Sequence, residues 1–334
     1  MSGVEQRRIG ADEAEMRLDR WFKRHFPALP HGRLSKLLRT GQVRVDGKRA
    51  QTSTRLETGQ VVRVPPLGAP ETAAAPPPSR PGVGRGVGRE DAALIRSLVI
   101  HQDDQVIVLD KPAGLAVQGG SKVGRHIDGM LDALAPKGGE RPRLVHRIDR
   151  DTSGILLLGR SAAAARALTG AFKSKTALKR YDAVVVGVPD LEEGRIDAAI
   201  LRPEKGRSRV AEDEADEDAK RAVTFYRVLD RAGKRAARLA LFPLTGRTHQ
   251  LRVHCAAMGT PILGDGKYGG RDAFLPGAEV AAMLHLHASR IRLPHPGGGM
   301  LDVSAPLAPH IVETLGYLGL DAALPLDLPE DLAP

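Results

Sequence analysis

One segment divides this chain of 334 residues into parts before any helix or strand is assigned. Residues 65–89 hold seven prolines and five glycines in 25 positions. Such a composition cannot bury enough apolar surface to offset the entropy lost on ordering, so it is typical of a linker. We therefore predict a small domain over residues 1–64, a linker over 65–89 and a large domain over 90–320. Residues 321–334, rich in Pro, Asp and Leu, are expected to form a loosely attached tail.

Positive charge is concentrated in the first part of the chain. The chain has 50 Lys and Arg against 40 Asp and Glu, and residues 1–64 contain 14 of the basic and 7 of the acidic residues. This excess suggests a polyanionic partner without proving one. The single cysteine, Cys255, excludes a disulfide framework and a multi-cysteine metal site. Because no apolar run approaches about 20 residues and the N-terminus has no apolar signal core, we expect a cytoplasmic protein without a membrane segment.

Two helices and a hairpin are predicted in the first part. Apolar residues recur at helical spacing over residues 16–26 and again over 32–40, with Gly41 where the second helix should end. Strands are expected at 43–45 and 60–64, and Asp46-Gly47 is a hairpin signal between them.

The second of these helices has a basic face. Arg33, Lys36 and Arg39 recur every third residue, so the face is either solvated surface or a surface that docks on phosphates. Together with Arg17-Leu-Asp19, Ser35-Lys-Leu-Leu-Arg39 and Gly41–Gly47, the order of elements resembles the RNA-binding domain named after ribosomal protein S4. The resemblance covers about residues 16–64 and implies binding of structured RNA through shape and phosphate contacts.

The densest polar cluster of the large domain is His146-Arg-Ile-Asp-Arg-Asp-Thr-Ser-Gly154. It leads directly into the apolar run 155–158, which is typical of a buried strand, so the cluster is expected to be a loop held against a sheet. Arg147 and Arg150 flank Asp149 and favour its ionised form. From local sequence alone, Asp149 could be a nucleophile, a general base or a salt-bridge anchor.

A second cluster is Thr245-Gly-Arg-Thr-His-Gln-Leu-Arg-Val-His254. Gly246 is expected to permit a tight turn, which leaves Arg247 and Thr248 at the start of a helix. His249 and His254 are five positions apart, so their rings would lie on different faces of that helix and make a poor metal pair. We expect no metal.

Two predicted strands carry further polar side chains. Residues 106–114 are predicted to form a strand ending in a Pro/Gly turn with Lys111, and 178–186 a strand with Tyr181 near its start. Without other information, a tyrosine there is most often a core residue whose hydroxyl bonds a partner.

Taken together, these motifs resemble the RluA family of pseudouridine synthases. The resemblance spans about residues 95–310, including Leu284-His-Leu-His287, and is nearest to the RluC/RluD branch. It implies an α+β fold with a mixed, largely antiparallel sheet, peripheral helices and a cleft across the middle. It makes Asp149 the catalytic aspartate, Arg247 its ion-pair partner, and Tyr181 the catalytic ring that stacks on the target base and can take a proton.

The family resemblance also implies the reaction and the partner. Specific uridines in RNA, expected to be 23S ribosomal RNA or a ribosomal precursor, would be isomerised to pseudouridine by a monomer without a cofactor. Whether the aspartate attacks the ribose or the base stays open. Residues expected to contact substrate or RNA are His146, Arg147, Arg150, Thr152, Lys111, Thr248, His249, Arg33, Lys36 and Arg39.

Two alternatives remain at this stage. The chain could be a non-catalytic RNA-binding or ribosome-assembly factor on the same scaffold, although its intact motifs favour the enzyme. The acidic segment 212–218 is expected to be a solvated loop, and the alternative is a loop that repels RNA and tunes which site can dock.

Overall fold

The computed structural model describes residues 4–27, 29–67, 87–120, 124–204, 207–211 and 218–323. The chain separates into two compact units, Met1–Val83 and Gly84–Pro334. The predicted linker spans this division, and its residues 68–86 lie outside the described residues. So do residues 212–217 of the acidic segment and 324–334 of the tail.

The first unit combines short helices with a four-stranded antiparallel sheet of order β1-β4-β2-β3. Its elements are β1 (Glu5–Arg8), η1 (Ala11–Glu13), α1 (Leu18–His25), α2 (His31–Arg39), β2 (Arg44–Val45), β3 (Lys48–Arg49) and β4 (Val61–Val64). Both predicted helices and the predicted hairpin are confirmed. Asp46 and Gly47 both have positive φ, 49° and 75°, as a tight hairpin turn requires.

Apolar residues at helical spacing form the core of this unit. Leu18, Trp21 and Phe22 of α1 pack with Leu34 and Leu38 of α2 and with valines of the sheet. The opposite face of α2 presents its basic side chains to solvent. The sequence did not indicate β1, because Glu5–Arg8 is polar throughout and lies at the edge of the sheet.

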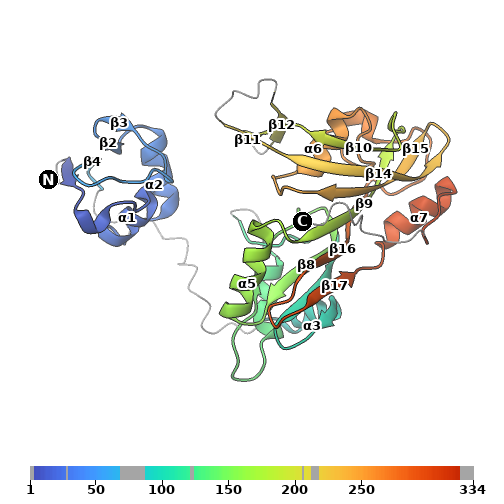
Figure 1. The fold of residues 1–334 in the computed structure, drawn as a ribbon, viewed down its shortest axis with the longest axis horizontal. Coiled ribbons are helices and arrows are strands. Elements are labelled where there is room, and N and C mark those ends of the chain that lie inside the picture. The colour runs from blue at the N-terminus through green and yellow to red at the C-terminus, as the bar shows by residue number, and fades with distance from the viewer. Residues whose placement is uncertain are drawn as a thin grey trace. The chain divides into compact units, whose positions relative to one another are not determined.

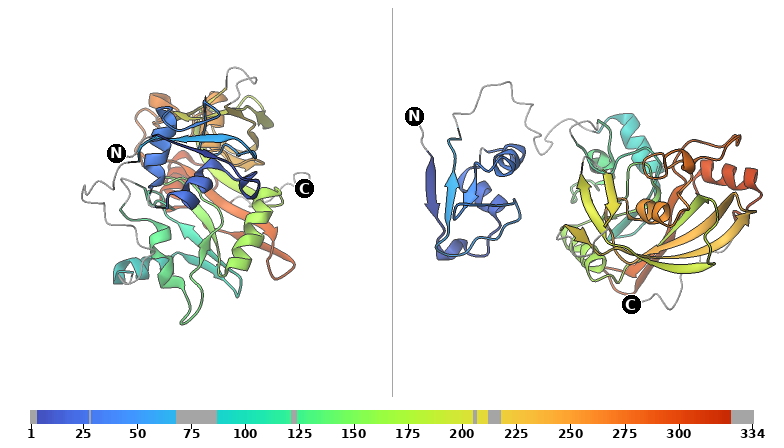
Figure 2. Two further views of the ribbon diagram at one scale, coloured as in Figure 1. Left: turned by 90° about the vertical axis from the view of Figure 1, so that its left-hand side faces the viewer. Right: turned by 90° about the horizontal axis from the view of Figure 1, so that it is seen from above.

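A ten-stranded mixed sheet organises the second unit (Figures 1 and 2). Its order is β10-β14-β15-β9-β16-β8-β6-β5, with β17 beside β16 and β7 beside β8. The strands are β5 (Val99–Gln102), β6 (Val106–Lys111), β7 (Arg143–Leu144), β8 (Ser153–Gly159), β9 (Leu178–Val186), β10 (Glu193–Asp197), β14 (Val223–Ala232), β15 (Ala236–Pro243), β16 (Leu286–Pro294) and β17 (Met300–Ser304). Every pair is antiparallel except β16 with β8, so the predicted mixed, largely antiparallel α+β fold is confirmed.

Helices lie at the periphery of this sheet (Figure 1). They are α3 (Arg89–Ser97), α4 (Ile127–Met130), α5 (Ala162–Lys173), α6 (Gln250–Ala257) and α7 (Pro309–Leu318), with short turns η2 (Leu131–Leu134) and η3 (Gly270–Ala273). A small separate sheet of order β12-β11-β13 lies near α6 and consists of β11 (Ile200–Glu204), β12 (Arg207–Val210) and β13 (Ala219–Lys220).

Buried strands at the middle of the large sheet carry the sequence motifs. All seven residues of β8 are buried, as the apolar run 155–158 predicted. At its start, Ser153 Oγ bonds His287 Nδ1 of β16 at 2.9 Å, and both side chains are buried. Gly154 has φ +100°, and a Cβ there would lie 2.3 Å from the Ala288 carbonyl oxygen. Only glycine fits this close approach of β8 to β16. The approach therefore fixes where the loop that contains Asp149 ends.

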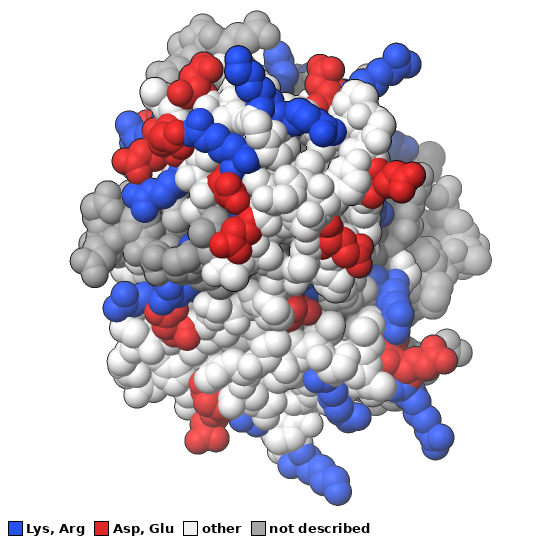
Figure 3. Space-filling model, turned by 90° about the vertical axis from the view of Figure 1, so that its right-hand side faces the viewer, with Lys and Arg blue, Asp and Glu red and all other residues white. Residues whose placement is uncertain are grey.

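Charge is distributed differently in the two units. Figure 3 shows a face of the second unit on which Lys and Arg alternate with Asp and Glu, so positive charge is not gathered there. Most of the surplus lies in residues 1–64, with 14 basic and 7 acidic residues. Across the described parts of the chain, no helix is long and apolar enough to cross a membrane.

Candidate active site

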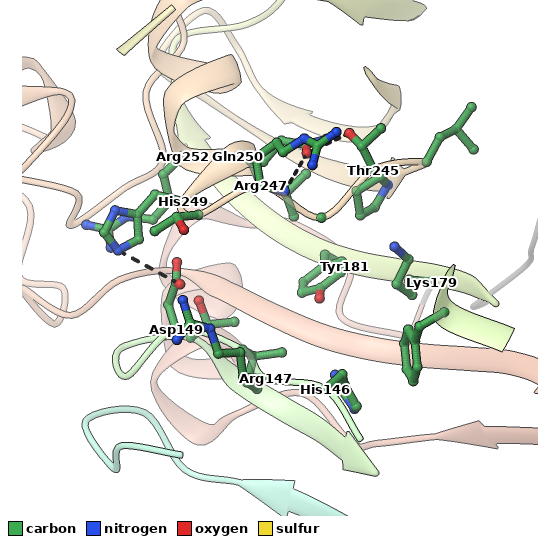
Figure 4. A pocket seen from close by; sticks show the side chains of 18 of the residues that line it. His146, Arg147, Asp149, Lys179, Tyr181, Thr245, Arg247, His249, Gln250 and Arg252 are labelled. Atoms are coloured by element: carbon green, nitrogen blue, oxygen red, sulfur yellow. Dashed lines mark hydrogen bonds and ion pairs between the residues drawn. The ribbon is translucent and has the colours of Figure 1, made fainter. Parts of the chain in front are cut away.

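A cavity of about 500 Å³ lies over the middle strands of the large sheet. Three parts of the chain line it: the loop that leads into β8, the start of β9, and the segment from the end of β15 into α6 (Figure 4). The side chain of Phe172 and neighbouring residues of α5 complete the wall. Two motifs that are about 100 residues apart in sequence therefore face the same cavity.

Asp149 belongs to the loop before β8 and faces this cavity. Its side chain is 27% exposed, which makes the carboxylate accessible but partly shielded from water. Among the described residues, the basic side chain within 4 Å of it is His249, whose Nε2 lies 3.9 Å from Asp149 Oδ1 (Figure 4). Flanking Arg150 pairs with Asp151 and not with Asp149. Among the described residues no arginine lies within ion-pair distance of this carboxylate, although Arg252 lines the neighbouring cavity with it. The carboxylate is therefore open to a ligand, which argues against a mere anchor.

Strand β9 presents Lys179 and Tyr181 to the cavity and the intervening Arg180 to the opposite face. The alternation is that of any β-strand. Burial and the negative charge of Asp149 raise the pKa of Tyr181, so its hydroxyl stays protonated at neutral pH. Burial lowers the pKa of Lys179 to about 8. The cavity thus combines an apolar ring with a partly desolvated amine.

Gln250 holds the segment that leads into α6. Its Oε1 accepts hydrogen bonds from Thr245 Oγ1 at 2.7 Å and from the Arg247 backbone N–H at 3.0 Å. Its Nε2 donates to the Val223 carbonyl at 2.9 Å and to Thr224 at 3.0 Å. All its hydrogen-bonding capacity is used internally, so Gln250 is a scaffold for the loop and not a substrate ligand.

The predicted ion pair between Asp149 and Arg247 is not formed in this structure. The Arg247 side chain is exposed, and its Nε donates to the Arg221 carbonyl oxygen at 3.1 Å. The Gln250 contacts place Arg247 on the β14 side of the cavity, away from the carboxylate (Figure 4). Among described residues, the basic ring within 4 Å of Asp149 is His249 instead, and burial keeps that imidazole uncharged.

His249 makes the sharp turn that the sequence predicts at Gly246. The backbone of His249 has φ 56° and ψ 23° at the N-cap of α6, whereas Gly246 does not have positive φ. A non-glycine residue in this left-handed region is uncommon and costs about 1–3 kcal/mol. The turn aims the imidazole between Asp149 and Tyr268, whose hydroxyl lies 2.6 Å from His249 Nδ1.

Lys111 does not contact solvent, which corrects its prediction as an RNA-binding residue. The side chain is 0% exposed, and Nζ donates to the carbonyl oxygens of Pro112, Leu115 and Arg150, each at 2.9 Å. Burial lowers its pKa to about 8. Three carbonyl partners satisfy all three N–H groups of the ammonium. The lysine therefore joins the turn after β6 to the Asp149 loop.

The other predicted contact residues fall into three groups. His146, Arg147, Thr152 and Thr248 line the same cavity as Asp149. Nε2 of His146 accepts a hydrogen bond from the Leu157 N–H at 2.9 Å, and its ring stacks on Phe172. Burial lowers the pKa of His146 to about 3, so it lines the cavity as a neutral side chain. Arg150 lines a neighbouring cavity that shares Asp149 and His249 with the first. Arg33, Lys36 and Arg39 are exposed on α2 of the first unit.

Several residues of the site were not singled out from sequence. Gln250 stood inside a quoted motif and Lys179 inside a predicted strand, whose alternation could have indicated Lys179 as a partner of Tyr181. Arg252 is buried and forms a bidentate pair with Asp265 at 2.7 and 2.8 Å. No local signal marks Tyr268, which lies in a glycine-rich turn 19 positions after His249.

Comparisons with known proteins find relatives over most of the chain. Residues 105–257 match the model of a family described as RNA pseudouridylate synthase. A protein named ribosomal large subunit pseudouridine synthase C from Vibrio cholerae is 36% identical, and the match covers 92% of this chain and 94% of that protein. An Arabidopsis thaliana protein named RNA pseudouridine synthase 4, mitochondrial, is 35% identical over 92% of this chain and 76% of its own length.

A solved structure has the same fold. The structure titled human RNA pseudouridylate synthase domain containing 4 superposes with a TM-score of 0.60 at 29% identity, covering 70% of this chain and 98% of that one.

Proposed function

The chain belongs to the RNA pseudouridylate synthase family, and we propose that it isomerises specific uridines to pseudouridine in large-subunit ribosomal RNA. The family makes it an isomerase acting on RNA. The choice of RNA is supported by relatives 33–36% identical over most of the chain that are named ribosomal large subunit pseudouridine synthase C. A role as a non-catalytic binding factor is not favoured, because every motif of the cavity is intact.

One observation carries the proposal: Asp149 and Tyr181 face a single cavity of about 500 Å³. This volume is within the range typical of small-ligand pockets, and one nucleoside fits it. A uridine must leave its stack to enter, at a cost of a few kcal/mol. The Tyr181 ring offers a face for the flipped base, and Phe172 and Ile148 close the apolar side.

Isomerisation breaks the bond between N1 and C1′, rotates the uracil and joins C5 to C1′. The proton on C5 is lost and N1 gains one, so the reaction needs no redox partner. An ionised carboxylate beside the sugar can act as nucleophile or as base in such a step. We assign that carboxylate to Asp149, because it is the acidic side chain that lines this cavity.

The protonated Tyr181 hydroxyl and the Lys179 amine can donate to uracil oxygens, and we assign them to positioning the base. The exposed Arg247 guanidinium lies at the cavity edge. We assign it to the RNA backbone, because its exposed donors suit a phosphate. Arg147 is exposed on the loop that carries Asp149 and can bind phosphates of the same RNA backbone.

We further propose that the first unit is an S4-like RNA-binding module over residues 1–64, joined by the linker 65–89 to a catalytic domain over 90–320. Arg33, Lys36 and Arg39 would contact phosphates through the exposed face of α2. The residues 321–334 would form a tail. We expect a monomer that acts in the cytoplasm without a metal or cofactor.

The test is conversion of defined RNAs by the purified chain. Unmodified transcripts of large-subunit ribosomal RNA, small-subunit ribosomal RNA and a tRNA pool are incubated with it, and pseudouridines are mapped by sequencing. The proposal expects discrete new pseudouridines in the large-subunit RNA only. Product confined to one of the other RNAs would contradict the assigned substrate, and no product in any RNA would contradict the activity.

A further inference from the structure

A chain of polar contacts reaches Asp149 from outside the uridine cavity. The Ser208 backbone N–H of β12 donates to the Tyr268 hydroxyl oxygen at 3.2 Å. The same hydroxyl lies 2.6 Å from His249 Nδ1, and His249 Nε2 lies 3.9 Å from Asp149 Oδ1. The order Ser208, Tyr268, His249, Asp149 therefore joins the small sheet to the carboxylate.

The Ser208 contact favours one direction for this series of hydrogen bonds. A backbone N–H can only donate, so the Tyr268 oxygen accepts from Ser208, and its own proton remains to be given to another group. His249 Nδ1 lies within reach, and we assign it as the acceptor of this proton. A neutral imidazole that accepts at Nδ1 carries its proton at Nε2, and that N–H faces Asp149.

The surroundings keep His249 neutral and the tyrosine in place. Burial lowers the pKa of His249, Asp149 and Asp265 oppose that shift, and Lys267 and Arg252 reinforce it. The Arg252 guanidinium lies 5.1 Å from the centre of the Tyr268 ring and is itself held by Asp265. The two rings of His249 and Tyr268 meet edge to face at 5.5 Å.

Ser208 makes a second contact with this series of hydrogen bonds. Its side chain is 2% exposed, and Oγ donates to the Thr248 carbonyl at 3.2 Å, next to the strained backbone of His249. One serine of β12 thus holds both the backbone before His249 and the tyrosine that directs its ring.

We propose that Ser208, Tyr268 and His249 form a relay that orients the Asp149 carboxylate for catalysis. His249 and Tyr268 are positioning residues: the 3.9 Å separation is longer than a hydrogen bond. The relay requires that this distance shorten to a hydrogen bond when uridine fills the cavity. The inference rests on the proposed role of Asp149. It assigns the orientation of the Asp149 carboxylate to Tyr268, a residue outside the motifs that carry the family resemblance.

The test is a double-mutant cycle with Tyr268→Phe and His249→Gln. The glutamine amide nitrogen can take the place of Nε2–H and donate to Asp149, yet it does not need a proton from Tyr268. Single-turnover rates on large-subunit ribosomal RNA, measured at saturating protein, report how well Asp149 is oriented. The Kd for the RNA reports binding. Tyr317→Phe is the matched control, because Tyr317 is 51% exposed on α7.

In the wild-type background, Tyr268→Phe should slow conversion about tenfold, as expected for loss of a hydrogen bond that serves a charged group. The RNA Kd should stay within about twofold, and Tyr317→Phe should change neither value. His249→Gln should retain most of the rate, and adding Tyr268→Phe to it should cost nothing more. His249→Phe, which lacks any donor, should be at least about tenfold slower than His249→Gln with the same Kd.

Two results would overturn the relay. One is a Tyr268→Phe rate equal to that of the wild type, and the other is the same tenfold loss in both backgrounds, which is the signature of a merely structural tyrosine. If Tyr268→Phe does not fold, equal rates for His249→Phe and His249→Gln overturn it. A wild-type chain that forms no pseudouridine refutes the proposed function, and the relay with it.

Discussion

Arg238 and Asp182 form a buried ion pair in the middle of the large sheet. Arg238 Nη2 and Nε lie 2.7 and 3.1 Å from Asp182 Oδ1, and each side chain is 1% exposed. Arg180 and Ser289 donate to the same carboxylate. Because residues alternate along β9, this network fixes one face of the strand whose other face presents Tyr181 to the cavity.

Asp182→Asn should therefore destabilise the second unit strongly. The variant removes the carboxylate charge that two buried guanidinium groups share, which costs about 3–5 kcal/mol of unfolding free energy. Urea denaturation measures the loss. Asp302→Asn is the matched control, because its pair with Arg290 has side chains 25% and 33% exposed, and it should cost less than about 1 kcal/mol. Equal losses in the two variants would contradict the role of burial.

Gly154→Ala should also be destabilising, by about 2–5 kcal/mol, since it adds strain at φ +100° to a clash with the Ala288 carbonyl. Gly246→Ala is the comparison, because no atom lies within 4 Å of a Cβ at that position. Thermal unfolding of the two variants should separate them clearly. A Gly154→Ala protein as stable as the wild type would show that β8 and β16 approach each other less closely at this position.

Lys179→Met should change stability in a pH-dependent way. The pKa of Lys179 is lowered to about 8 from 10.5, so between these values the unfolded chain binds more protons than the folded one. Stability of the wild type then rises with pH through this window, as the penalty for burying the ammonium is relieved.

Methionine carries no such penalty. We expect Lys179→Met to be more stable than the wild type by about 1–2 kcal/mol at pH 7, and the gain to fade as pH rises from about 8 to 10. Urea midpoints across this range provide the measurement. Lys173→Met, at an exposed position of α5, should show no such trend. A gain that is constant with pH would mean that the amine is not desolvated.

Removing the basic face of α2 should weaken RNA binding in a salt-dependent way. The triple variant Arg33→Gln, Lys36→Gln, Arg39→Gln should lower the slope of log K against log salt by about 2–3, since each phosphate that a side chain neutralises adds nearly one unit to that slope. A control triple variant at Arg231, Lys234 and Arg235, exposed beside the β14–β15 turn, removes the same charge from the second unit. The same slope in the wild type and the α2 variant would argue against docking by this helix.

The strands at the middle of the large sheet could be predicted because they have a local sequence signal. The apolar runs at 106–111, 155–158 and 178–186 lie in β6, β8 and β9, and the first unit follows its helical and hairpin signals. The strands β1 and β11–β13 could not be predicted, since their short polar sequences lack a period and depend on pairing with distant partners.

The sequence indicated which residues belong to the site, but it did not indicate which of them contact one another. Asp149, Tyr181 and Arg247 line one cavity, but the pairing of Asp149 with His249 depends on a left-handed backbone that histidine rarely adopts. The interior position of Lys111 depends on a carbonyl 39 residues later. Such contacts are set by tertiary packing and leave no trace in residue type or spacing.

The central claim is that the Asp149 carboxylate carries the isomerisation, and Asp149→Asn tests it most directly because the amide keeps the shape and removes the charge. Single-turnover conversion of large-subunit ribosomal RNA is measured beside the RNA Kd, with Asp132→Asn as a control at a side chain 58% exposed. We expect the rate to fall at least about a thousandfold with Kd within about twofold, and the control to match the wild type. Conversion by Asp149→Asn at the wild-type rate would contradict the account.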